Sequence, residues 1–343
     1  MSDSAVTARR PEGVPGRQDQ HAPASAEAGR ASLMLLAVTA IWGLSFSWLK
    51  DWQTAAGDCP GGGLLASLTL IGLRMAIAFA IVAVFLPGLV LRPTFREHLA
   101  GATVGAVFLA GHVPQVWGLG TTTPALSALF TSLSSAWVPL AAWLYLGERP
   151  TAWTLPGFLL AITGTLAIAG IGMSGAALDG AGLHFGDWLT LLASVAFTGQ
   201  VIVLDRLGRL ARPGHLTAGF FAGPGLLAMA LALAVAAVGP GVASWWEWMA
   251  GTLRDPAVEI NIVRLTLLPT VLGFHWMNTY QPRVTASRAA LIYLLEPVFA
   301  SIYSIWRGHD RLTYSLVLGG CLILAGNAVL ELPNWLPRRA TAR

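Results

Sequence analysis

The distribution of charge is the feature that most limits the folds open to this chain. Only 11% of its 343 residues are charged and 55% are hydrophobic, whereas a typical soluble domain has about 25% charged residues. The charges lie in short intervals between apolar runs that are long enough to cross a bilayer. Because a crossing segment must satisfy its own backbone hydrogen bonds, the sequence predicts an all-α polytopic membrane protein.

Ten apolar stretches have the length of a transmembrane helix. Residues 1–31 and 333–343 lack such a stretch, so we expect a disordered N-terminal tail and a short C-terminal tail. The ten expected helices are 32–49, 64–90, 99–119, 124–146, 153–174, 184–205, 216–239, 258–279, 286–306 and 314–332.

Lysine and arginine placement predicts the orientation. Fifteen of these residues lie in the two tails, in alternate loops or at their borders, whereas four lie in the other loops. Positive charge favours the cytoplasmic side, so we expect a multi-pass protein of the cell inner (plasma) membrane with both termini cytoplasmic. The loops expected outside include 50–63, 175–183, 240–257 and 307–313.

The chain repeats itself after 162 residues. Residues 148–151 (ERPT) fall on 310–313 (DRLT), and Gly157 and Gly164 fall on Gly319 and Gly326. Five helices per copy is an odd number, so the second copy must insert upside down. We therefore expect two inverted five-helix repeats, 32–174 and 184–332, around a central cavity. The glycines are expected at close helix contacts, and Asp310 at a helix end as a cap or an ion-pair partner.

Four segments carry a family resemblance: AIWGLSFSWLK, LYLGERPTAWTLPGFLLAITGTLAI, GDWLTLLASVAF and LEPVFASIYSIWRGHDRLTYSLVLGGCLILAG. In their order and duplication they resemble the EamA-type transporters of the drug/metabolite transporter superfamily, over about residues 32–332. The resemblance implies a secondary transporter rather than an enzyme, with alternating access and export of amino acids, other metabolites or drugs. One departure is the stretch 307–311 (RGHDR), which has one more residue before its acid than the family pattern.

An acid and a proline stand side by side inside an apolar run, at Glu296 and Pro297. Tyr293 and Glu296 share a helical face with Ala289, and a carboxylate against lipid is costly, so we expect this face to line a wet cavity. Pro297 removes a backbone donor and predicts a local break. Protonation of Glu296 is expected to be coupled to transport, unless Glu296 is a neutral hydrogen-bond partner. The positions 162 residues earlier are Ser127, Thr131 and Ser134.

Polar pairs at i, i+3 mark two further helices: His112 with Gln115, and His275 with Asn278. Arg74 has two open explanations, which are contact with a substrate carboxylate and a snorkel toward the outer interface. Aromatic residues would cover the apolar part of a substrate. The expected substrate-binding residues are Trp42, Arg74, His112, Gln115, Thr131, Ser134, His275, Asn278, Tyr293 and Glu296.

Two other classes of function remain open. A haem-binding electron carrier could use His112 and His275 as axial ligands. A membrane-embedded enzyme would need a nucleophile, for which Ser45 is a weak candidate. No cofactor or metal is expected. The expected partners are the lipid bilayer and a small-molecule substrate, with no nucleic acid, because the net charge of +4 follows from topology. The sequence leaves the substrate and the oligomeric state open.

Overall fold

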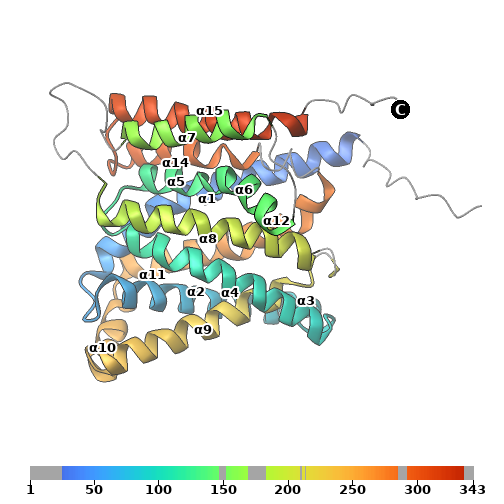
Figure 1. Ribbon diagram of the computed structural model, residues 1–343. Coiled ribbons are helices and arrows are strands. Elements are labelled where there is room, and N and C mark those ends of the chain that lie inside the picture. The colour runs from blue at the N-terminus through green and yellow to red at the C-terminus, as the bar shows by residue number, and fades with distance from the viewer. Residues whose placement is uncertain are drawn as a thin grey trace, which may run out of the picture.

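The computed structural model describes residues 25–146, 152–168, 183–208, 211–212, 214–284 and 292–335, which contain helices and no strand. The helices run roughly along one direction and form a single bundle (Figure 1). They are α1 (Ser25–Ala56), α2 (Gly62–Phe85), α3 (Gly88–Leu91), α4 (Phe95–Gly118), α5 (Pro124–Ser132), α6 (Ser134–Leu146), α7 (Thr154–Ile168), α8 (Phe185–Gly208), α9 (Thr217–Val238), α10 (Val242–Thr252), α11 (Pro256–Leu265), the π-helical η1 (Thr266–Gly273), α12 (Phe274–Tyr280), the 3-10 turn η2 (Gln281–Arg283), α14 (Glu296–Trp306) and α15 (Tyr314–Trp335).

Six helical segments among the described residues are long and apolar enough to cross a membrane. They are α1 from Gly29, α2, α4, α8, α9, and the run from α11 to Met277. Shorter apolar helices occupy 154–167 and 314–329. Several membrane-length helices in one chain confirm a polytopic membrane protein.

The bundle is organised around long helix pairs. The helices α7 and α15 pack together at one edge, and α9 packs on α2 and α4 at the opposite edge (Figure 1). Between these edges, α1 contacts α5, α11, α12 and α14, and α8 packs on α4 and α5. The largest buried apolar cluster joins α1, α2, α4, α9 and α11. The central helices are therefore held on several sides by other helices.

Glycines allow the close approach of α7 and α15. A Cβ atom on Gly164 would lie 2.6 Å from the carbonyl oxygen of Gly319, and one on Gly326 would lie 2.6 Å from that of Gly157. Any side chain at these two positions would therefore collide with backbone. The close helix contact predicted for these four glycines is confirmed, and the pairing is reciprocal between residues separated by 162 positions.

The structure corrects several predicted boundaries. The first helix extends from Ser25 to Ala56 instead of 32–49, and the expected outer loop 240–257 contains α10. The expected helix 124–146 is divided into α5 and α6 at Leu133, and the expected helix 258–279 contains the π-helical turn η1. Trp245 attaches α10 to the bundle. Its side chain is 5% exposed, and its Nε1 donates a hydrogen bond to Thr69 Oγ1 of α2 at 2.9 Å.

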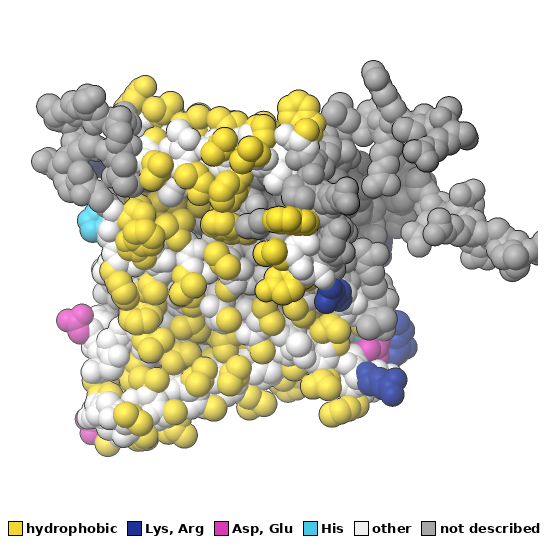
Figure 2. All heavy atoms as spheres, in the orientation of Figure 1, with side chains coloured by type: hydrophobic (Ala, Val, Ile, Leu, Met, Phe, Trp, Pro, Cys, Tyr) yellow, Lys and Arg dark blue, Asp and Glu magenta, His cyan; other side chains and the backbone are white. Residues whose placement is uncertain are grey.

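The two ends of the bundle differ in charge. The helix α1 begins and α15 ends at the same end, on the right of Figure 1. Figure 2 shows the lysines and arginines of this face gathered at that end. There, Arg212 binds Glu97, the third residue of α4, and the hydrogen bond to Glu97 raises the pKa of Arg212. This is the end that the sequence predicts to be cytoplasmic.

The glycine contact yields a test of the α7–α15 pair. Gly164→Ala should lower the free energy of unfolding by about 1–3 kcal/mol, because the new methyl group meets backbone that cannot move aside. Gly199→Ala in α8 is the control, since the nearest atom to its Cβ would be Val107 Cγ1 at 3.7 Å. Melting temperatures of the purified variants in detergent measure the difference. Equal melting temperatures would show that the two helices do not meet at Gly164.

Candidate functional site

A buried arginine lies at the centre of the site. Arg74 of α2 is 3% exposed and lies twelve residues from the start of its helix, which is about 18 Å along the helix axis. Its Nη1 lies 3.3 Å from His112 Nε2, and its Nη2 donates to Thr270 Oγ1 at 2.8 Å. Among the described residues, no carboxylate is within ion-pair distance of Arg74. A guanidinium at this depth therefore has only uncharged partners.

The histidine beside Arg74 starts a directed chain of hydrogen bonds. A guanidinium only donates, so His112 Nε2 must accept and His112 Nδ1 must carry the proton. Nδ1 then donates to Gln115 Oε1 at 2.8 Å, and Gln115 Nε2 donates to Thr131 Oγ1 at 3.1 Å. Thr131 Oγ1 donates to the carbonyl oxygen of Ser127 at 2.7 Å. The chain links α2, α4 and α5, and it requires a neutral His112.

Trp42 of α1 forms the aromatic part of the site. Its Nε1 donates to the carbonyl oxygen of Pro269 at 3.0 Å. Its ring lies 5.5 Å from that of Phe274 and 5.8 Å from that of Tyr293. The next residue, Gly43, allows α1 to touch α14, because a Cβ there would lie 2.8 Å from the carbonyl oxygen of Glu296. Trp42 and Gly43 therefore bring α1, η1 and α14 together.

Glu296 begins α14, and Pro297 follows as its second residue. The side chain of Glu296 is half-buried, and no hydrogen bond joins it to a described residue. Tyr293, one turn earlier, donates its hydroxyl to Gln281 Oε1 at 2.9 Å. The break predicted at Pro297 is confirmed, because α14 starts only at Glu296, although the preceding residues 292–293 are also helical.

The break in the second half has a counterpart in the first. Leu133 separates α5 from α6 with φ −61° and ψ −14°, and Leu295 precedes α14 with φ −82° and ψ −10°. The two leucines are 162 residues apart. These turns interrupt the continuous polar faces that the sequence predicted. Ser134 begins α6, and its carbonyl oxygen accepts from Thr198 Oγ1 at 3.1 Å instead of joining the Gln115–Thr131 chain.

A π-helical turn supplies two of the contacts to the site. In η1, Thr270 Oγ1 donates to Leu265 O, five residues earlier, at 2.9 Å, and it accepts from Arg74. Pro269 lies inside this turn and cannot donate a backbone hydrogen bond. Sequence analysis missed Thr270, although Pro269 inside an expected helix was a signal of irregular backbone. Wide turns of this kind are frequent at functional sites.

The remaining predicted residues lie in different settings. His275 is half-buried in α12, where its Nδ1 has no partner among the described residues. The backbone of Asn278 belongs to α12, but its side chain is outside the described part of the structure. Ser45 donates to the carbonyl oxygen of Trp42 at 2.7 Å, which is a helix contact and not that of an activated nucleophile. Both ring nitrogens of His112 are engaged, so it offers none to a haem iron.

An ion cluster joins three helices at the end of the bundle opposite the start of α1. Asp51 of α1 pairs with Arg264 of α11 at 2.8 Å, with Arg307 after α14 at 3.0 Å and with His309 at 2.9 Å. The pKa of Arg307 is raised, first by its hydrogen bond to Tyr303 and further by Asp51. Sequence analysis missed this cluster, because its members are far apart in the chain and were counted only as topology signals.

The extra residue in the stretch 307–311 has a structural role. His309 reaches Asp51, and Asp310 Oδ2 accepts from the backbone nitrogen of Ala125 at 3.1 Å. Asp310 also accepts from Ser304 Oγ. Ala125 is in the first turn of α5, so the predicted helix-capping role of Asp310 is confirmed, across the two halves of the chain.

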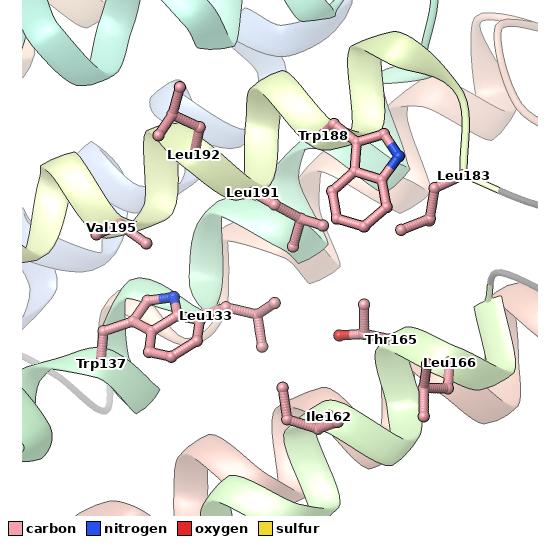
Figure 3. A pocket seen from close by; sticks show the side chains of 10 residues that line it. All are labelled: Leu133, Trp137, Ile162, Thr165, Leu166, Leu183, Trp188, Leu191, Leu192 and Val195. Atoms are coloured by element: carbon pink, nitrogen blue, oxygen red, sulfur yellow. The ribbon is translucent and has the colours of Figure 1, made fainter.

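A groove of about 430 Å³ lies away from the polar chain, between α6, α7 and α8, with Leu133 at its wall. Figure 3 shows its side chains turned toward a common space, with the Thr165 hydroxyl as the oxygen among them. Trp188 is 60% exposed and Leu192 is 59% exposed along its wall. An apolar groove with such walls fits a surface against lipid and lacks the polar groups that a metabolite site needs.

Comparisons with known proteins point to one family. The EamA-like transporter family matches residues 184–332. An uncharacterized transporter of Archaeoglobus fulgidus is 24% identical over 302 residues, covering 88% of this chain and 86% of the relative. A probable terminal-alkyne amino-acid exporter of Streptantibioticus cattleyicolor is 28% identical over 299 residues, covering 84% and 91%.

A solved structure shares the fold. One crystal structure of a protein aligns with a TM-score of 0.53 at 19% identity, over 89% of this chain and 97% of the other. The family match, the two relatives and the polytopic helical bundle agree with the motifs in the sequence. The chain is therefore similar to the EamA-like transporter family, which matches residues 184–332, and to two transporters over most of its length.

Proposed function

We propose that this membrane transporter exports a small metabolite by alternating access, through ten transmembrane helices arranged as two inverted repeats, 32–174 and 184–332. The observation that carries the proposal is the pair of helix breaks at Leu133 and Leu295, at equivalent positions of the two copies. Discontinuous helices in symmetry-related positions are typical of substrate sites in secondary transporters. The reciprocal glycine contact between α7 and α15 also supports the repeat.

The substrate site lies between the two breaks. Arg74, His112, Gln115 and Thr131 form its polar side, and Trp42 with Tyr293 forms its aromatic side. Such a site suits a small molecule with one polar and one apolar part. The relative from S. cattleyicolor is named "Probable terminal-alkyne amino-acid exporter". An amino acid with a short apolar side chain is therefore the first substrate to test.

The Asp51 cluster acts as the outer gate in this proposal. It joins α1, α11 and the end of α14, and the same three segments carry Trp42, η1 and Glu296 at greater depth. Opening the outer end requires these ion pairs to separate. Glu296 lies ten residues from the outer end of α14, about 15 Å along the helix axis. In this proposal, protonation of Glu296 is coupled to the transport cycle.

Export of L-propargylglycine, a terminal-alkyne amino acid, tests the function. Cells that produce the protein should retain less of the compound than cells that lack it. Trp42→Phe should slow efflux roughly threefold to tenfold, because it removes the hydrogen bond to Pro269. Trp188→Phe in the exposed groove is the matched control and should export normally. Equal retention in producing and non-producing cells would exclude this substrate, and equal efflux by both variants would exclude Trp42 from the site.

Proton coupling through Glu296 is tested with Glu296→Gln. The amide keeps the shape of the side chain but cannot titrate, so transport in proteoliposomes should lose its dependence on pH. Glu247→Gln on the exposed face of α10 should keep the parent profile. A variant at Glu296 that inserts normally and shows the parent rate and pH profile would make Glu296 a structural residue.

The outer gate is tested with Asp51→Asn. Without the carboxylate, two arginines and a histidine face one another, so the outer end should open more often. A cysteine at Thr131, in a Cys59→Ser and Cys321→Ser background, reports access to an impermeant thiol reagent added from outside. Labelling should be several-fold faster with Asp51→Asn and unchanged with Asp58→Asn, which alters an exposed acid at the same end. Unchanged labelling in both variants would rule out the gate.

A further inference from the structure

We propose that Arg74, with His112 and Thr270 beside it, is the subsite that binds the carboxylate of the substrate. The proposal rests on the transport function above and specifies the chemistry that the site recognises. Arg74 Nη1 faces His112 Nε2 at 3.3 Å, and Nη2 faces Thr270 Oγ1 at 2.8 Å and Leu265 O at 3.5 Å. All three partners are uncharged.

The guanidinium has donors left over. Of its five N–H groups, the one on Nε is buried and has no partner among the described residues. Nη1 has one partner among the described residues and so has a second N–H to give, and an N–H of a charged guanidinium makes a strong hydrogen bond to a carboxylate oxygen. Because His112 must be neutral to accept from Arg74, the subsite carries a single positive charge, which one monoanion compensates.

A purely structural role does not account for an arginine here. Hydrogen bonds between α2, α4 and η1 could be made by a neutral side chain, which would avoid burying a charge. An unpaired ion loses several kcal/mol of hydration when it is buried. The snorkel considered from the sequence is also excluded, because the side chain is 3% exposed and contacts neighbouring helices. An anionic ligand would provide the missing compensation.

The position of Arg74 fits a substrate that has a carboxylate at one end and an apolar group at the other. Thr270 follows Pro269 in η1, and the carbonyl oxygen of Pro269 accepts from Trp42. Arg74 and Trp42 therefore hold adjacent residues of the same π-helical turn. With its carboxylate at Arg74, the substrate would place its apolar part near Trp42, whose ring contacts those of Phe274 and Tyr293.

Binding to the purified full-length protein tests the subsite. The probes are L-propargylglycine, its carboxamide, 4-pentynoate and inorganic phosphate, each titrated while the melting temperature is recorded. The two carboxylates should stabilise the parent protein and the carboxamide should not. Arg74→Gln should weaken carboxylate binding roughly tenfold or more, because a charged hydrogen bond is lost. Arg206→Gln is the control and should bind like the parent, because Arg206 is an exposed arginine in the last turn of α8.

The outcomes separate this proposal from the transport function. Equal binding of acid and carboxamide by the parent, binding of phosphate alone, or undiminished carboxylate binding by Arg74→Gln would each overturn the subsite. If Arg74→Gln does not fold, the comparison of acid and carboxamide on the parent and on Arg74→Lys decides. Equal export of acid and carboxamide would overturn the subsite and leave transport standing. Carboxylate binding without export would overturn the transport function and leave the subsite standing.

Discussion

The constraint on which this structure depends is the absence of water in the bilayer core. Every polar group there must find a partner within the protein, because an unsatisfied one costs several kcal/mol. The chain from Arg74 through His112 and Gln115 to Thr131 meets most of this demand, although Arg74 Nε has no partner among the described residues. The chain also fixes the positions of α2, α4 and α5 relative to one another. Its one charged member, Arg74, has no counter-ion in the part of the chain that the structure describes, and on the proposal above this exception marks the substrate site.

Irregular backbone is placed where polar side chains and neighbouring helices can support it. At Leu133 the regular helix ends, and Asn327 of α15 donates to the carbonyl oxygen of Ser132 at 3.1 Å. Directly after Leu295, the start of α14 packs against Gly43 of α1. Irregular segments within the membrane are tolerated where protein or a cavity surrounds them. Both breaks are therefore supported by a neighbouring helix, whereas α7 and α15 pack together through regular helix at their glycine contacts.

The sequence predicted the class of fold well and the site only in part. Apolar runs separated by charges are enough to indicate membrane helices, and the recurrence of Gly157 and Gly164 at Gly319 and Gly326 indicated a close contact. The helix break at Leu133 has no proline beside it, so its position is not predicted as directly as the break at Pro297. The partners of Arg74 could not be found from spacing, because Thr270 is 196 residues away in the chain. Contacts of that kind depend on how helices pack, which periodicity does not report.

A charge that has no counter-ion in the empty site gives the substrate a way to shift the conformational equilibrium of a transporter. A ligand shifts a conformational equilibrium only by the difference in its affinity for the two states. In the closed arrangement, Arg74 is shielded from water and has neutral partners, so an anion that binds there gains more than it would in an open, hydrated cavity. On the proposal above, the carboxylate of the substrate would stabilise the closed state more than the open one, and the empty protein would lack that stabilisation. Buried charge at Arg74, a deformable turn at η1 and the Asp51 cluster at the outer end would then act on the same helices in one cycle.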